Sequence, residues 1–139
     1  TGLTGLPLEQ IHTWGDWKRD PRARIITVAH LALMEAGLPV RAGDDAADAC
    51  FFDLTCRLLD AEEEHGSLTE TWQFHLSNAS RNTELSSTLQ ECSRTDSLLP
   101  QYTYRLLEND GVAFDHPFVI GQGILYIRHL LSSRPINRP

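Results

Sequence analysis

Residues 24–34, RIITVAHLALM, constrain the fold more than any other part of the chain. β-Branched residues lead this segment. Apolar side chains fall on both faces of the strand it would form, with Ile26, Val28 and Ala32 on one and Ile25, Leu31 and Leu33 on the other. A strand that is apolar on both faces sits in the middle of a sheet, with a further layer over each side. The segment therefore predicts a central strand in a layered fold.

A shorter strand is predicted before it. Residues 8–13 alternate in part between apolar and polar side chains, and the following Trp14-Gly15-Asp16-Trp17 and Asp20-Pro21 contain the turn residues that end a strand. After the central strand, residues 46–54 are expected to form a strand towards Phe51-Phe52, and residues 55–66 a short helix. This part of the chain is predicted as strand, loop, strand, strand and helix.

Three later segments alternate between apolar and polar residues and are separated by turn-rich spacers. They cover residues 68–77, 84–92 and 102–108, and they predict an antiparallel meander. Residues 115–132 are different, because their apolar positions follow one helical stripe: Ile120, Ile124, Ile127 and Leu131. We predict a final helix there, with Asp115 as its N-cap and Pro117 in its first turn.

Two glycines inside this predicted helix need a reason, because each costs about 1 kcal/mol relative to alanine. Gly121 and Gly123 would be accounted for if the helix backbone packed closely against a sheet. His116 is in line with the apolar stripe of Ile120, Ile124 and Ile127, so we expect it to point towards the sheet.

Composition excludes several classes of function. The 139 residues contain 41% hydrophobic and 22% charged residues, as in a globular domain, and we predict one domain over residues 1–139 with an insert at about 55–109. The net charge of −7 argues against nucleic acid as a partner. No apolar run reaches the roughly 18 residues of a membrane span, and no signal peptide is recognisable, so a cytoplasmic protein is expected. Three cysteines, Cys50, Cys56 and Cys92, form neither a C-x-x-C pair nor a disulfide framework.

Several motifs, in order, resemble one branch of the Nudix family. They are residues 8–16 (LEQIHTWGD), residues 19–24 (RDPRAR) before the apolar strand, the acidic-alanine run of residues 43–52, and Ala113-Phe114-Asp115-His116 at the start of the last helix. The resemblance covers about two-thirds of the chain. It implies an α+β sandwich with a mixed β-sheet, incomplete at the N-terminus, carrying an antiparallel insert and a C-terminal helix. The branch includes ADP-ribose pyrophosphatases and related regulators.

The family's metal-binding box is represented only by its end. Thr1-Gly2-Leu3 fits the final x-Gly-apolar step, and Glu62-Glu63-Glu64 lacks the Arg-Glu and the glycine that the box requires. The resemblance implies Mg²⁺ or Mn²⁺ in an intact parent protein, because water attacks a diphosphate with the help of cations. We predict no metal site and no catalytic residue in this chain, and negligible hydrolysis by it alone.

The resemblance points to a set of substrate-binding residues around the turn and the helix start. The predicted set is Trp14, Asp16, Asp20, Arg22, Arg24, Asp115 and His116. Arg22 or Arg24 could bind a phosphate bidentately, or could instead pair with a nearby aspartate. Trp14 and Trp17 could stack on an adenine, or could anchor the loop to the core.

The helix start leaves similar alternatives open. Asp115 could act in ligand binding or simply cap the helix, and His116 could orient a ligand phosphate or be a packed, hydrogen-bonded histidine. His12, His30 and His75 lack metal spacing. Asp44, Asp45 and Asp48 form an acidic loop, for which solvation is the simpler interpretation.

Three hypotheses of function follow. The first is the C-terminal part of a Nudix hydrolase of nucleoside diphosphates linked to another group, with an ADP-ribose-like, nucleotide-sugar type small molecule as ligand. The second is a non-catalytic Nudix-like module that binds a nucleotide or a protein. The third is a piece that forms a homo-oligomer through exposed sheet edges, because such edges invite pairing.

Overall fold

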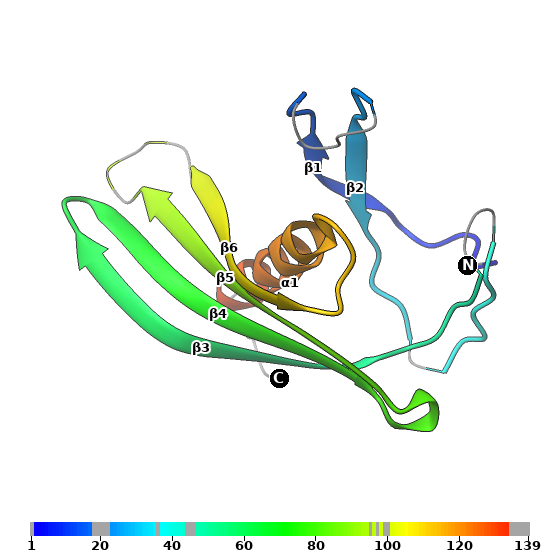
Figure 1. Cartoon of the computed structure of the whole chain (residues 1–139). Helices are drawn as coiled ribbons and strands as arrows, with labels where there is room; N and C mark the ends of the chain where they lie inside the picture. The colour runs from blue at the N-terminus through cyan, green and yellow to red at the C-terminus, as the bar shows by residue number, and fades with distance from the viewer. Residues whose placement is uncertain are drawn as a thin grey trace, which may run out of the picture. The chain divides into compact units, whose positions relative to one another are not determined.

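The computed structural model describes residues 2–17, 23–35, 37–43, 47–94, 96, 98 and 101–133. Two of the predicted substrate-binding residues, Asp20 and Arg22, lie outside this range. The described part contains six strands, one short 3₁₀ helix and one α-helix, which confirms the α+β class (Figure 1). All four strand pairings are antiparallel. The predicted mixed sheet is wrong for the described residues, because neither sheet contains a parallel pair. The Nudix-like arrangement stays a prediction.

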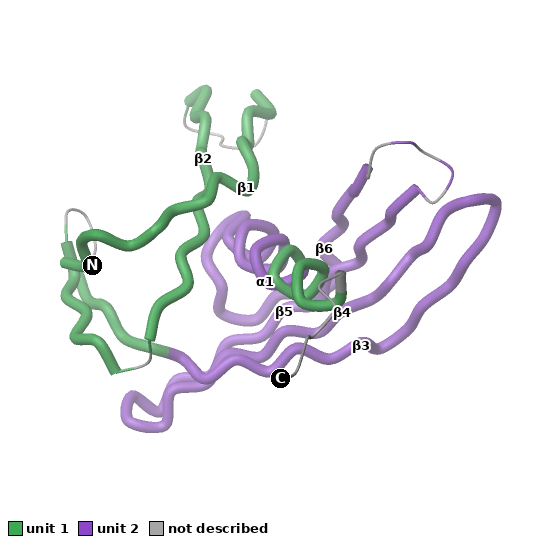
Figure 2. The backbone as a smooth tube through the Cα atoms, turned by 180° about the vertical axis from the view of Figure 1, so that it is seen from behind, with its two compact units in different colours: residues 1–51, 126–139 green, residues 52–125 purple. Residues whose placement is uncertain are grey.

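The chain divides into two compact units (Figure 2). Unit 1 contains residues 1–51 and 126–139, and unit 2 contains residues 52–125. The boundary falls inside the α-helix, so its first part belongs to unit 2 and its last part to unit 1.

Unit 1 is built on a hairpin of two strands, β1 (Glu9–Trp14) and β2 (Thr27–Leu31). Glu9 lies opposite Leu31 at one end and Trp14 lies opposite Thr27 at the other. The register shifts between Gln10 and His12, so β1 contains a bulge. The strand predicted at residues 8–13 is confirmed.

The prediction of a central strand at residues 24–34 is wrong. β2 is five residues long and belongs to a two-stranded sheet, in which no strand can be central. Ala29 is buried at 6% exposure, but Ile26 is 60% and Leu33 is 65% exposed. A strand with two apolar faces is buried only where the fold places a further layer over each face. Among the described residues no such layer covers Ile26 and Leu33, which remain partly in solvent.

Unit 2 is an antiparallel sheet of four strands in sequence order: β3 (Asp53–Glu64), β4 (Ser67–Asn78), β5 (Thr83–Arg94) and β6 (Tyr102–Asp110). The three strands predicted at residues 68–77, 84–92 and 102–108 are confirmed as a meander. A 3₁₀ turn, η1 (Ala79–Arg81), joins β4 to β5, and the Asn78 side chain accepts a 3.0 Å hydrogen bond from the Arg81 N–H.

Residues 55–66 form most of β3, so the predicted short helix is wrong, and the strand predicted at residues 46–54 is correct only from Asp53 onwards. Leucine, alanine and glutamate favour helices in this segment. Pairing with β4 over eleven positions overrides that preference, and His65 and Gly66, with φ of 50° and 75°, close the hairpin.

The helix α1 (His116–Ser133) confirms the prediction for residues 115–132. Its buried positions in unit 2 are Pro117, Gly121, Gly123 and Leu125, and none of them belongs to the predicted stripe. Leu125 packs with Trp72, Phe74 and Leu89 of the sheet. The stripe residues Ile120 and Leu131 are exposed, because the small Gly121 rather than the larger Ile120 allows the helix to approach the sheet.

The prediction that His116 turns towards the sheet is also wrong, because this residue is exposed. It precedes the buried Pro117 by one position, about 100° around the helix. Close packing of the helix backbone is confirmed at Gly121, where an added Cβ would overlap Leu89 and come within 3.2 Å of Phe74. Within the described ranges, no helix is both long and apolar enough to cross a membrane.

Candidate functional site

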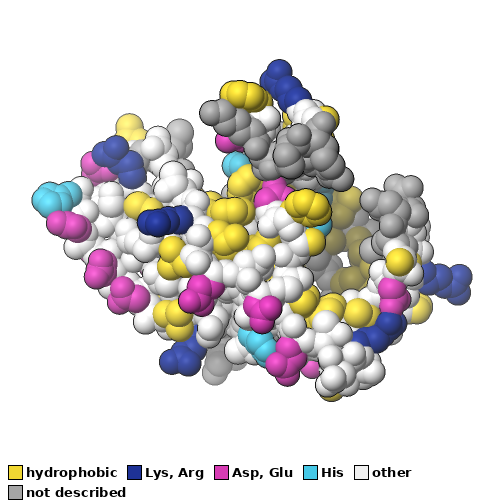
Figure 3. Space-filling view, in the orientation of Figure 1, with side chains coloured by type: hydrophobic (Ala, Val, Ile, Leu, Met, Phe, Trp, Pro, Cys, Tyr) yellow, Lys and Arg dark blue, Asp and Glu magenta, His cyan; other side chains and the backbone are white. Residues whose placement is uncertain are grey.

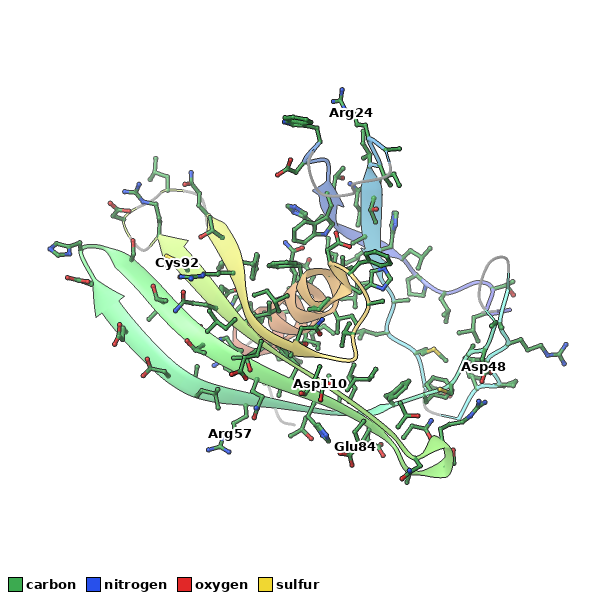
Figure 4. The ribbon with its side chains drawn as sticks, viewed as in Figure 1. Arg24, Asp48, Arg57, Glu84, Cys92 and Asp110 are labelled. Carbon is green, nitrogen blue, oxygen red and sulfur yellow. The ribbon has the colours of Figure 1, made fainter. Side chains whose placement is uncertain are left out.

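The loop end of the β1–β2 hairpin gathers three of the predicted substrate-binding residues in unit 1. Trp14 is the last residue of β1, and its partner Thr27 is the first residue of β2. Asp16 follows Trp14 by two positions and Arg24 precedes Thr27 by three, so the antiparallel register brings both to the same end of the hairpin. Figure 4 shows Arg24 at this end.

Trp14 is positioned by packing against its own strand. Its ring meets the His12 ring edge-on, with 4.6 Å between centroids and 65° between planes, and the residue is half-buried. The indole nitrogen of Trp14 is buried. A hydrogen bond of 3.1 Å from the Gln10 side-chain amide to the Thr13 hydroxyl supports the same strand. Trp14 therefore fits the interpretation of a loop anchor better than that of an open stacking surface.

Trp17 offers the aromatic surface that Trp14 does not. Its side chain is 67% exposed, and Asp16 and Arg24 are exposed as well. At this end of the hairpin an exposed indole can in principle stack on a base, a carboxylate can accept a hydrogen bond from a hydroxyl, and a guanidinium can bind a phosphate. The hairpin end thus combines the three types of contact that a nucleotide requires.

Asp115 and His116 belong to unit 2 and are positioned by the start of α1. The backbone carbonyl of Asp115 accepts a 3.0 Å hydrogen bond from the Phe118 N–H, and that of Ala113 accepts one from the His116 N–H. Asp115 is half-buried and His116 is exposed. Phe114, just before them, has a φ of 47° and an exposed ring. The two groups of predicted site residues thus lie in different units.

A pocket of about 230 Å³ lies at the opposite end of the hairpin in unit 1. It is lined by Pro7, Glu9, Leu31, Leu33, Ile127, Leu130 and Leu131. Glu9 is the one ionisable side chain among these lining residues, and it accepts a 3.3 Å hydrogen bond from the Tyr126 hydroxyl. None of the predicted substrate-binding residues that the structure describes lines this pocket. Its volume is below the roughly 300 Å³ at which drug-sized ligand sites begin.

A row of facing residues, three of them polar, crosses the sheet of unit 2 on the face that contains Trp72 and Phe74. Ala61, Glu70, Glu91 and Tyr104 lie opposite one another on the four strands. Glu91 is 2% exposed, although a carboxylate is among the most costly groups to bury. The Tyr104 hydroxyl donates a hydrogen bond to it, which offsets part of that cost.

Burial is the main reason why the pKa of Tyr104 is raised far above its usual value. The charge of Glu91 and its hydrogen bond with the phenol add to the effect, because each of them favours the protonated hydroxyl. Tyr104 therefore remains a neutral hydrogen-bond donor wherever the chain is folded. Sequence analysis missed this pair. The alternation of Tyr102, Tyr104 and Leu106 indicated that the tyrosine lies on the apolar face, but nothing in the sequence indicated the burial of Glu91.

The acidic run Glu62-Glu63-Glu64 does not have the geometry of a divalent cation site. These residues lie on β3, where successive side chains point to opposite faces of the sheet, so Glu63 is directed away from its two neighbours. All three are exposed. On the face shown in Figure 3 the acidic side chains are likewise distributed along the sheet. We therefore assign no metal-dependent step to this run.

No family model, curated protein or solved structure matches the chain.

Proposed function

We propose that this chain is the ligand-recognition part of a Nudix-type hydrolase that acts on nucleoside diphosphates linked to another group, with ADP-ribose as the representative ligand. The observation that carries the proposal is the hairpin register, in which Trp14 opposite Thr27 brings Asp16 and Arg24 to one end. The order of the motifs along the chain adds support.

The chemistry of the hairpin end suits a dinucleotide-like ligand. The planar guanidinium of Arg24 can donate two parallel hydrogen bonds to a phosphate, which a lysine cannot reproduce. The carboxylate of Asp16 can accept hydrogen bonds from ribose hydroxyls, and the exposed Trp17 indole can stack on the base. In this proposal Trp14 is a positioning residue, because its half-buried ring fixes the end of β1 from which Asp16 and Trp17 extend.

Hydrolysis is assigned to the parent enzyme and not to these side chains. The Arg-Glu-x-x-Glu-Glu motif that binds Mg²⁺ or Mn²⁺ in the family is not found in the 139 residues. The role of this chain is to bind and orient the ligand, so binding by it requires no metal. A non-catalytic nucleotide-binding module would share this property, and turnover by the parent protein separates the two functions.

Calorimetry with ADP-ribose tests the proposal, with and without Mg²⁺. Arg24→Gln and Asp16→Asn are each expected to weaken binding by roughly tenfold or more, because each removes a charge-assisted hydrogen bond. Arg105→Gln is the matched control, since it replaces an exposed arginine of unit 2, and its affinity should equal that of the unchanged chain. No heat of binding at millimolar ADP-ribose, or equal losses in all three variants, would contradict the proposal.

A further inference from the structure

The strongest unused feature of unit 2 is the outer edge of β3. This strand is twelve residues long and pairs on one side with β4, and no described residue pairs with its other side. Leu54, Leu58 and Leu59 are exposed on it, the first at 46%. A long edge strand with exposed leucines is a template for pairing with another strand.

The charges on the first half of β3 are arranged for pairing with an identical strand. Asp53 and Arg57 are both exposed, and they are four residues apart, so they lie on the same face of the sheet. When two copies of β3 run antiparallel with Thr55 opposite Thr55, Asp53 of each copy lies opposite Arg57 of the other. Opposite charges at directly facing positions stabilise a strand pair.

The second half of β3 restricts the register. The register against β4 shifts between Leu58 and Asp60, and the strand then ends in Glu62-Glu63-Glu64. A register centred between Leu58 and Leu59 would place Asp53 opposite Glu64, and like charges at facing positions are destabilising. Centring the pair on Thr55 uses only the regular part of the strand and leaves the acidic run outside the interface.

The apolar side chains agree with the same register. Leu54, Cys56 and Leu58 lie on the face that contains the Trp72 and Phe74 core, since they are opposite Leu76, Phe74 and Trp72. With Thr55 on the axis, Leu54 of one copy faces Cys56 of the other, and directly facing residues point to the same side of a sheet. Each copy would therefore cover part of the apolar surface that β3 exposes.

We infer that two copies of this chain associate through β3, antiparallel and centred on Thr55, to form a continuous eight-stranded sheet. The partner is a second copy because one strand supplies both members of each Asp53–Arg57 pair. The opposite edge of the sheet, β6, is shorter and exposes fewer leucines. Figure 4 shows the Arg57 side chain extending outward from β3.

Sedimentation equilibrium of the whole chain at low ionic strength tests the inference. The unchanged chain is expected to dimerise, and Arg57→Asp to raise the dimer Kd by roughly tenfold or more, because it places two like-charge pairs in the interface. The double variant Asp53→Arg/Arg57→Asp restores both ion pairs and should return the Kd to within about threefold of the original. Arg105→Asp on β6 is the matched control and should leave the Kd unchanged.

A chain that stays monomeric at high concentration overturns the inference, as does an unaltered Kd in Arg57→Asp. A double variant that dimerises as weakly as the single variant overturns the proposed register.

Circular dichroism shows whether each variant is folded. If Arg57→Asp is unfolded, the variant Thr55→Cys tests the same interface. In the proposed dimer its two introduced thiols face each other at a Cα separation of about 5 Å, which is within disulfide range. Mild oxidation should therefore link the two copies covalently. Thr103→Cys on β6 should give no such linkage, and failure of Thr55→Cys to link also overturns the inference.

Discussion

The Tyr104 hydroxyl donates a hydrogen bond to the buried carboxylate of Glu91, its direct neighbour across the β5–β6 ladder. Glu91 is the most deeply buried acidic residue of the described chain, and it shares the core face with Trp72. A buried carboxylate without a hydrogen-bond donor would strongly destabilise the folded chain. The Tyr104–Glu91 pair therefore stabilises the pairing of β6 with β5.

Tyr104→Phe is expected to destabilise the chain by about 1–3 kcal/mol at neutral pH, because Glu91 then loses a donor that water cannot replace. Urea unfolding followed by circular dichroism measures this. Tyr102→Phe removes an exposed hydroxyl from the same strand and should change stability by less than about 0.5 kcal/mol. Equal effects of the two substitutions would contradict the role given to Tyr104.

The raised pKa of Tyr104 also predicts a loss of stability in alkali. Below the ordinary tyrosine pKa of about 10 the phenol is protonated in both folded and unfolded chains, and its contribution is fully present. Above that pH the unfolded chain loses this proton while the folded chain retains it, so stability falls as pH rises. The slope attributable to Tyr104, up to about 1.4 kcal/mol per pH unit, should be missing in Tyr104→Phe. A slope identical to that of the unchanged chain would show that Tyr104 ionises freely in the fold.

Gly121→Ala is expected to destabilise unit 2 by about 1–3 kcal/mol, although alanine is the better helix former. The added Cβ would overlap Leu89 in the core, and overpacking outweighs the roughly 1 kcal/mol gain in helix propensity. Gly15→Ala is the control, because no atom outside its immediate neighbours lies within 4 Å of its added Cβ. Thermal unfolding of both variants checks the prediction, and a stabilised Gly121→Ala would show that helix and sheet are not in close contact there.

His65→Asn is expected to stabilise the β3–β4 hairpin by about 0.5–1 kcal/mol. His65 has a φ of 50° and is exposed, and Asn-Gly is the preferred pair for a two-residue turn in which both residues have positive φ. Gly66→Ala should have the opposite effect, because its φ is 75° and its added Cβ would lie 3.3 Å from the Cβ of Asp96. Chemical denaturation compares them, and a loss of stability in His65→Asn would argue against this turn.

Arg94 and Asp96 form a bidentate pair after β5, with nitrogen–oxygen distances of 2.9 and 2.7 Å. The hydrogen bonds from Arg94 lower the pKa of the Asp96 carboxyl. We expect Arg94→Gln to raise that pKa towards its ordinary value, as measured by carbon NMR titration of the carboxyl. Because the pair is exposed, global stability should change little. An unchanged Asp96 pKa in the variant would mean that the pair is absent in solution.

Local patterns in the sequence determined the elements whose residues depend mainly on near neighbours. The alternation of residues 68–77, 84–92 and 102–108 and the helical periodicity of residues 115–132 correctly predicted four elements of the fold and its α+β class. Close packing was correctly expected at Gly121, because a glycine inside a helix implies a near neighbour. Trp14, Asp16 and Arg24 could be grouped from sequence because they flank a single turn.

Tertiary structure alone decided the features that depend on distant partners. Residues 55–66 have helix-forming side chains, but the complementary strand β4 makes them a strand. Residues 24–34 have two apolar faces, but other parts of the fold decide whether these faces are covered, and a local sequence pattern carries no information on them. The burial of Glu91 follows from the alignment of β5 with β4 and β6, because its cross-strand neighbour Tyr104 supplies the hydrogen bond that makes a buried carboxylate tolerable. Local patterns thus determined the conformation of the meander strands and of the helix, while pairing between strands decided the conformation of residues 55–66 and which side chains meet.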